Sequence, residues 1–188
     1  MTKEKKTHVC PWWLGYFLLG PVRRSVHDPH TILSPYIREG MRVLEIGPGM
    51  GFFSLTLAQL VGERGGVICV DIQEKMLRRL RRRGEKKGLG KRITLVRASE
   101  DSLNIQQFQG AVDFTLVFAV VHEVPDQSRL FTEIHRSMRP GALLLLSEPR
   151  GHVTQEEFDR SLATARAAGF KLESHLEIKR TISSLLSG

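Results

Sequence analysis

The stretch "VLEIGPGMGFFS", Val43–Ser54, decides which fold this 188-residue chain adopts. Three glycines at alternate positions, Gly47, Gly49 and Gly51, follow one short apolar run and precede another. Glycine allows a sharp turn and a close backbone approach to a ligand, and the N-terminus of a following helix favours negative charge. The stretch is therefore predicted to be a strand, a loop that binds a nucleotide-like cofactor, and the start of a helix.

Strand-like and helix-like segments alternate along the rest of the chain. Apolar, β-branched runs predict strands over residues 42–46, 67–71, 93–98, 112–119 and 142–149. Helical spacing predicts helices over 52–61, 73–88, 127–138 and 154–169, after a short helix within 28–37. This alternation predicts the α/β class: a Rossmann-like three-layer sandwich with a seven-stranded, mainly parallel sheet. Residues 171–177 and 181–187 are expected to form a C-terminal hairpin that contributes one antiparallel strand.

Local signals mark the ends of two of these helices. The helix over 127–138 is expected to stop at Pro140 and Gly141. Thr154 and Glu157 have the spacing of a capping box, which predicts the start of the last helix. Between these helices, the unbroken leucines of "ALLLLSEP" predict a strand that is buried on both faces.

Length and composition favour one domain over residues 1–188, with an N-terminal segment over 1–36 and a cofactor-binding core over 37–188. The hydrophobic fraction of 41% is sufficient for a core. The only two cysteines, Cys10 and Cys69, support neither a disulfide framework nor a thiolate metal site. We therefore expect no metal and a reducing, cytoplasmic location.

The N-terminal run "PWWLGYFLLG" is apolar and follows a basic segment, which superficially resembles a signal peptide. It is shorter than the roughly 20 residues that a spanning helix needs, and no small-residue cleavage site follows it. We expect this segment to pack over the domain. Peripheral membrane contact by residues 11–24 is the alternative.

The spacing of the glycines distinguishes between cofactors. A dinucleotide fingerprint, G-x-G-x-x-G, requires glycine at the position that Phe52 occupies. The pattern present is E-x-G-x-G-x-G, with Glu45 as its acid, and it resembles motif I of class I S-adenosylmethionine-dependent methyltransferases. Asp71 ends the next strand, where a carboxylate can accept hydrogen bonds from both ribose hydroxyls or can cap the following helix. NAD binders share this acid, but Phe52 argues against an NAD oxidoreductase.

The resemblance extends from Ile32 to the end of the chain. "VDFTLVFAVVHEVPD", "LFTEIHRSMRPGALLLLSEP" and "ATARAAGFKLESHLE" are similar to later segments of the small, ubiquinone and menaquinone methyltransferase-like members. The resemblance implies S-adenosylmethionine as cofactor and S-adenosylhomocysteine as product. The residues it implies in cofactor binding are Glu45, Gly47, Pro48, Gly49, Gly51, Asp71, Ile72, Ser99, Glu100 and Phe118. Ala98 departs from the family pattern, because an adenine-binding Asp is common there, and Glu100 or Asp101 is expected to substitute.

His122 lies just beyond the fourth strand, where the family's substrate meets the methyl group. It is the candidate catalytic residue, as a general base for an acceptor that must lose a proton, but a structural histidine that caps the next helix is the interpretation that its position favours. The resemblance also implies that residues 1–36 form a cap or lid that covers the cofactor and shapes the substrate pocket. This pocket is expected to be lined by Trp13, Tyr16, His27 and His122.

The expected function is methyl transfer to a small-molecule acceptor, because the sequence shows no separate recognition domain and no Asn/Asp-Pro-Pro-Tyr signature. An RNA methyltransferase that uses the basic helix 75–92 is one alternative, and a non-catalytic S-adenosylmethionine-binding module is another. The net charge is +8, and residues 75–97 hold eleven Lys or Arg but one acid, Glu85. No aromatic residues interleave with these charges, so we expect Arg81–Arg83 to be a solvated face.

Overall fold

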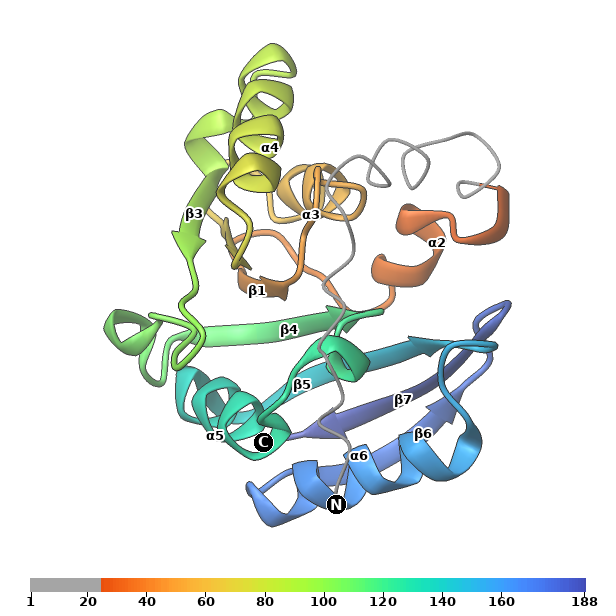
Figure 1. Ribbon diagram of the computed structural model, residues 1–188. Coiled ribbons are helices and arrows are strands. Elements are labelled where there is room, and N and C mark those ends of the chain that lie inside the picture. Colours follow the sequence, from red (N-terminus) through yellow and green to blue (C-terminus); the bar gives the residue numbers. More distant parts are fainter. Residues whose placement is uncertain (1–24) are drawn as a thin grey trace.

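The computed structural model describes residues 25–188, and this part of the chain forms a sheet of seven strands (Figure 1). Their order is β3-β2-β1-β4-β5-β7-β6. The strands are β1 (Arg42–Ile46), β2 (Gly66–Asp71), β3 (Ile93–Arg97), β4 (Val112–Phe118), β5 (Met138–Pro149), β6 (Lys171–Leu176) and β7 (Thr181–Ser187). Strands β1 to β5 pair in parallel, whereas β7 is antiparallel to both β5 and β6. The predicted mainly parallel sheet with a C-terminal hairpin is confirmed.

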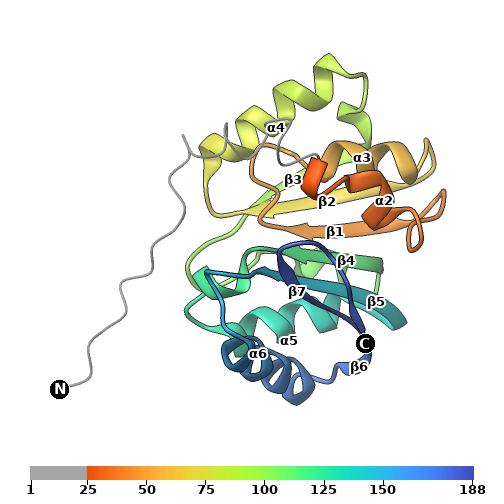
Figure 2. The same ribbon diagram turned by 90° about the vertical axis from the view of Figure 1, so that its right-hand side faces the viewer.

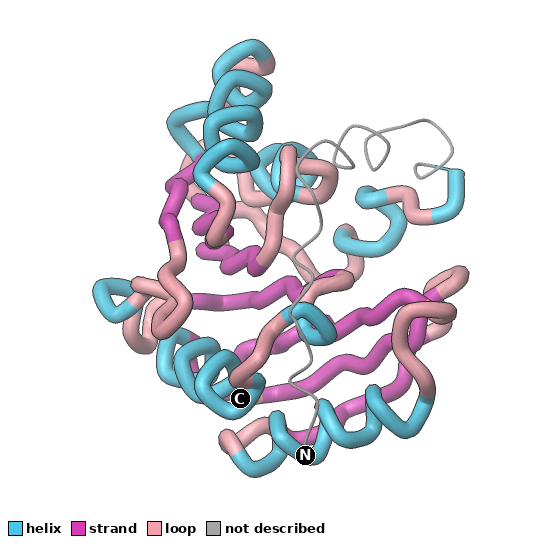
Figure 3. Tube along the Cα trace, in the orientation of Figure 1, coloured by secondary structure: helices cyan, strands magenta, loops and turns pink. Residues whose placement is uncertain are grey.

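Helices cover both faces of this sheet, which confirms the three-layer arrangement (Figures 2 and 3). The helices are α2 (Pro29–Leu33), α3 (Ser54–Leu60), α4 (Glu74–Lys86), α5 (Gln127–Ser137) and α6 (Gln155–Ala167). Short 3₁₀ turns are η2 (Gly90–Arg92), η3 (Gln106–Phe108) and η4 (Val121–Glu123). Figure 2 shows α2, α3 and α4 on one side of the sheet and α5 and α6 on the other.

Alternate residues of the central strands belong to two hydrophobic cores, one on each face of the sheet. Leu44 and Ile46 of β1 pack on the α5–α6 side, whereas Val43 packs with residues of α2, α3 and α4. On β5, Leu144 and Leu146 face the first core and Leu145 faces the second, and all three are fully buried. Burial on both faces follows from helices on both sides of a parallel sheet.

The start of β5 differs from the prediction. The helix ends at Ser137, and Met138 is already extended and pairs with Val112 of β4. The next registered pair is Phe114 with Leu143, so residues 139–142 form a bulge within β5. The helix thus ends within one residue of the predicted bound, but Pro140 and Gly141 lie in a bulge of β5 and not in a turn before the strand. A missing N–H and a positive φ are tolerated in such a bulge.

Helix α6 begins at the predicted capping box. The backbone N–H of Glu157 donates to Oγ1 of Thr154 at 3.2 Å, and the N–H of Thr154 donates to Oε2 of Glu157 at 3.0 Å. Within residues 25–188, no helix combines the length and apolar character needed to cross a bilayer.

Candidate active site

The site lies at the carboxyl edge of the sheet, where the strand order changes direction. From β1 the chain builds β2 and β3 on one side and then crosses to β4 and β5 on the other. Ile46, the last residue of β1, pairs with Val70 of β2 and with Val117 of β4. The loops after β1, β2 and β4 therefore meet at a topological switch point, the usual ligand position in open α/β sheets.

The glycine loop after β1 is held in left-handed conformations. The φ angles are +66° at Gly47 and +55° at Gly49. A Cβ at Gly47 would lie 2.4 Å from Cγ2 of Val120, so glycine there allows the loop after β4 to pack closely. A Cβ at Gly49 would meet nothing within 4 Å, which leaves open space over the middle of the loop.

Asp71 joins the end of β2 to this loop. One carboxylate oxygen accepts the N–H of Gly49 at 3.3 Å, and the other accepts the N–H of Gln73 at 2.8 Å. Gln73 is the N-cap residue of α4, so the alternative role of Asp71 as the cap was wrong. Each oxygen keeps acceptor capacity for a further hydrogen bond. Burial raises the pKa of Asp71 to about 6.

Ile72 follows Asp71 and presents an apolar surface beside it. Its side chain is 40% exposed, and it is the one large hydrophobic residue of the described chain that is exposed. An exposed apolar side chain next to a carboxylate suits a ligand that carries a flat ring beside hydroxyl groups.

Glu45 lies beneath the glycine loop and is only 3% exposed. Its Oε2 accepts the hydroxyl of Ser54, the first residue of α3, at 2.5 Å, and Sγ of Cys69 lies 3.7 Å from the same oxygen. Burial, followed by the charge of Glu45, raises the pKa of the Cys69 thiol well above its usual value. Glu45 thus connects β1, β2 and α3, and its contact with a cofactor stays a prediction.

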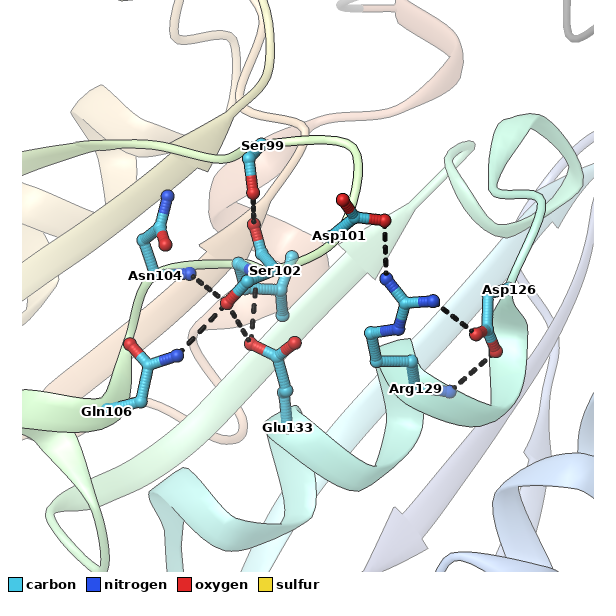
Figure 4. Close-up of polar contacts among 9 residues, drawn as sticks. Ser99, Asp101, Ser102, Asn104, Gln106, Asp126, Arg129 and Glu133 are labelled. Atoms are coloured by element: carbon cyan, nitrogen blue, oxygen red, sulfur yellow. Dashed lines mark hydrogen bonds and ion pairs between the residues drawn. The ribbon is translucent and has the colours of Figure 1, made fainter.

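The loop after β3 is fixed to α5 by polar contacts (Figure 4). Glu133 accepts the hydroxyl of Ser102 at 3.1 Å and the N–H of Leu103 at 2.9 Å. Arg129 binds Asp101 at 3.2 Å and Asp126 at 2.8 Å. Asp101 is therefore directed toward α5. The predicted contact residues Ser99 and Glu100 lie exposed in the same loop.

His122 lies in η4, after β4, and its ring is held by Glu148 near the end of β5. Nδ1 of His122 contacts Oε2 of Glu148, while Oε1 accepts the N–H groups of Val120 at 3.0 Å and Val121 at 2.8 Å. Glu148 is 1% exposed, and the His122 side chain is 25% exposed. The hydrogen bond that the imidazole makes to Glu148 raises the pKa of His122.

Comparison with known proteins decides the family of the chain. The model of a family described as a methyltransferase domain matches residues 37–181. The chain belongs to this methyltransferase family. The domain is of the class I, S-adenosylmethionine-dependent type, as the glycine spacing indicated.

The relatives of this methyltransferase domain include enzymes of quinone biosynthesis. The ubiquinone/menaquinone biosynthesis C-methyltransferase UbiE of Shewanella sp. (strain W3-18-1) is 28% identical over 133 residues, which cover 69% of this chain and 52% of the relative. UbiE of Yersinia enterocolitica serotype O:8 / biotype 1B is 30% identical over 118 residues, 63% of this chain and 46% of the relative. The chain spans about half the length of these curated relatives.

The fold matches solved methyltransferases as well. The crystal structure of a SAM dependent methyltransferase from Aquifex aeolicus has a TM-score of 0.84 and 25% sequence identity, and the match covers 95% of this chain and 98% of that chain. The Rossmann-like architecture predicted from the alternation of strands and helices is confirmed.

The residues at the edge of the methyltransferase domain fit S-adenosylmethionine. The open space over Gly49, the remaining acceptor capacity of Asp71 and the exposed Ile72 lie together after β1 and β2. They match a ligand whose ribose hydroxyls and adenine ring must be held side by side. The sequence had identified these residues from local spacing, and the structure brings them together.

Two other predicted residues, Phe118 and His27, lie against one another. Phe118 is 7% exposed, and its ring centroid lies 5.2 Å from that of His27 and 4.7 Å from that of Phe53. Nε2 of His27 lies 2.7 Å from the carbonyl oxygen of Lys179, in the turn between β6 and β7. Trp13 and Tyr16, like the membrane contact proposed for residues 11–24, lie outside the described residues.

The basic helix α4 differs in one respect from the expected solvated face. Met76, Leu77 and Leu80 are buried on its inner side, as predicted, and Arg81 and Arg82 are exposed. The third arginine of that run is only partly solvated. Arg83 is half-buried, because its guanidinium donates to the carbonyl of Met50 in the glycine loop.

Glu148 is the site residue that the sequence analysis missed. It stands in "LLLLSEP", where an acid ends a run of buried leucines. An acid at the carboxyl end of a buried strand could have identified it. Such a carboxylate needs hydrogen-bond partners, so it indicates other polar groups nearby.

Proposed function

We propose that this protein catalyses S-adenosylmethionine-dependent methyl transfer to a small-molecule acceptor and releases S-adenosylhomocysteine. The observation that carries the proposal is the bond between Gly49 and Asp71 at the switch point of a domain that belongs to a methyltransferase family. Cys69, a buried free thiol, supports the further proposal of a cytoplasmic location.

The protein's main contribution to the reaction is alignment. When bound, S-adenosylmethionine supplies an activated methyl group on a sulfonium. Asp71 would hold the ribose, and the glycine loop would support the cofactor from below. Because Val120 packs on Gly47, the loop that carries His122 lies directly beside that support. Holding the acceptor and the methyl in line accounts for much of the rate that such an enzyme needs.

The relatives suggest which acceptors to test first. Both are named for ubiquinone/menaquinone biosynthesis, so hydroxylated aromatic rings related to quinols are the first candidates for this chain. The match covers about half of each relative, and the acceptor of this chain is therefore proposed by class only.

Calorimetric titration with S-adenosylmethionine, S-adenosylhomocysteine and NAD tests the cofactor. We expect the first two to bind and NAD to bind weakly, with loss of affinity in Asp71→Asn. Binding of NAD alone would overturn the proposal. Transfer of labelled methyl to hydroxylated aromatic compounds, in parallel with RNA, then tests the acceptor class. Cofactor binding without transfer to any acceptor would favour the non-catalytic module.

A further inference from the structure

Glu148 makes one contact more than is needed to hold the loop after β4, and that contact is to His122. Oε1 of Glu148 accepts two backbone N–H groups, which is sufficient to hold the loop after β4. Oε2 is committed to the imidazole of His122 instead. A carboxylate that accepts from Nδ1–H places the basic lone pair of a neutral imidazole on Nε2. The contact therefore sets both the orientation and the tautomer of the ring.

This pair also lies beside the elements that fit the cofactor. The loop that carries His122 begins at Val120, which packs against Gly47. The same loop continues to Glu123, whose charge contributes to the raised pKa of Asp71. The imidazole therefore belongs to the same edge of the sheet as the glycine loop and Asp71, on the side of β4 and β5.

We propose that His122 and Glu148 act as a proton-accepting pair, with Glu148 as the positioning residue, and that the acceptor loses a proton as it is methylated. Its class is then a phenol or other hydroxyl, a neutral amine, or an acidic C–H, and not a thioether or tertiary amine. This inference rests on the proposed function.

The chemical step balances in charge and atoms. The acceptor atom forms a bond to the methyl carbon, the carbon–sulfur bond breaks, and its electron pair remains on sulfur as a neutral thioether. The proton of the acceptor moves to Nε2 of His122. One positive charge is thus transferred from the sulfonium to the imidazolium, which the carboxylate of Glu148 stabilises.

The groups around His122 determine its expected pH dependence. Glu148 from β5, Glu123 from η4 and Glu157 from α6 all raise the pKa of His122, with the hydrogen bond to Glu148 as the largest cause. The ring of His152 lies 6.0 Å away, centroid to centroid. The imidazole is a base only above its pKa, so kcat is expected to rise with pH through that value and to reach a plateau above it.

Glu148→Gln is the informative variant, because its amide keeps the shape of the carboxylate. The carbonyl oxygen of the new side chain can still accept from Val120 and Val121. Its NH₂ group would then donate to Nδ1 of His122, which forces the ring proton onto Nε2 and removes the base. Loop structure is preserved while the tautomer is reversed.

The experiment combines NMR titration of His122, the pH profile of kcat, and calorimetry with S-adenosylmethionine. In Glu148→Gln we expect a lower pKa of His122, a lower kcat on the plateau, and cofactor affinity within about twofold of wild type. His122→Asn should lower kcat by about 100-fold or more. His152→Asn, a nearby histidine outside the pair, serves as the control and should keep both the kcat plateau and the rising limb.

The outcomes separate this inference from the proposed function. Wild type could bind S-adenosylmethionine while the rising part of its kcat–pH profile does not follow the pKa of His122 measured by NMR. In that case the pair is structural, and this inference fails while the proposed function stands. An unchanged His122 pKa in Glu148→Gln, or a methylated acceptor with no proton to lose, overturns it equally. If wild type fails to bind S-adenosylmethionine, the proposed function falls, and the inference falls with it.

Discussion

The two halves of the sheet's carboxyl edge are held together by different kinds of contact. At the ends of β1 and β2, the contacts are made largely by the backbone: left-handed glycines and N–H groups that bond Asp71. At the ends of β4 and β5, they are made by side chains from distant positions, with Glu148 holding His122. The half at β1 and β2, here called the cofactor half, is suited to a cofactor common to a whole family. The half at β4 and β5, here called the acceptor half, can change its side chains with the acceptor while the backbone stays the same.

The largest effect is expected where the two halves touch. Gly47→Ala combines a left-handed φ with a methyl group 2.4 Å from Val120, so it should lower the free energy of unfolding by about 2–4 kcal/mol. Gly49→Ala is the matched control, because its φ is also positive but its Cβ meets nothing; about 1–2 kcal/mol is expected. Urea unfolding measures both, and equal losses would show that the close approach of Val120 is not a constraint.

A smaller effect, confined to the cofactor half, is expected for Asp71→Asn. Loss of hydrogen bonds to a charged acceptor should weaken S-adenosylmethionine binding by about 10- to 100-fold. In wild type, Asp71 is protonated below a pKa of about 6, so affinity should fall as the pH is lowered through that value. Calorimetry from about pH 5 to about pH 8, on both sides of this pKa, would show this fall in wild type and a nearly flat profile in the variant.

The raised pKa of Asp71 also predicts how the stability of the fold changes with pH. Ionisation of a group whose folded-state pKa lies above its unfolded value weakens the fold, so this contribution is full below the unfolded pKa of 3.8 and is lost as pH rises through about 6. Bound cofactor should offset part of this loss, because hydroxyl donors favour the carboxylate. Thermal unfolding with and without S-adenosylmethionine at several pH values checks the sign.

Substitutions in α6 are expected to affect the acceptor half and to leave the cofactor half unchanged. Thr154→Ala removes the capping box and should cost about 1 kcal/mol of unfolding free energy, with S-adenosylmethionine affinity unchanged. Thr164→Ala, in the same helix, loses only a hydroxyl bond to the carbonyl of Arg160 and should change stability little. A large loss of cofactor affinity in Thr154→Ala would mean that the halves are more strongly coupled than their contacts indicate.

The smallest effect is expected outside both halves, on the exposed face of α4. Arg81→Glu with Arg82→Glu should change stability and small-molecule methyl transfer by less than about 0.5 kcal/mol. Arg83 is left intact because it contacts the glycine loop. If RNA binding is measurable and the variant reduces its salt dependence, the RNA alternative gains and the small-molecule proposal loses support.

The same division explains what could be predicted from the sequence. The loop over Gly47–Gly51 and the acid Asp71 follow from local spacing, because each strand and its loop are continuous in the chain. Glu148 and His122 are 26 residues apart, and they meet only because β4 and β5 pair with Phe118 opposite Ser147. That register comes from tertiary pairing, which single-sequence patterns do not contain.

Two further differences from the prediction have separate causes. Pro140 and Gly141 are breakers of regular structure, but a bulge in a strand satisfies their backbone requirements as well as a turn does. Arg83 was assigned to a solvated run from its neighbours. Its partner, the carbonyl of Met50, lies 33 residues earlier in the chain, so the contact depends on how α4 packs over the glycine loop.

Strand β7 is the last strand in sequence but lies between β5 and β6 in the sheet. Ile182 of β7 pairs with Glu148 itself, so the strand that carries the positioning carboxylate has an open edge until residues 181–187 have been synthesised and docked. The strands that pair with one another as β1–β2 and β2–β3 are all contained in residues 42–97, so this part of the sheet is synthesised long before β5 gains its antiparallel neighbour.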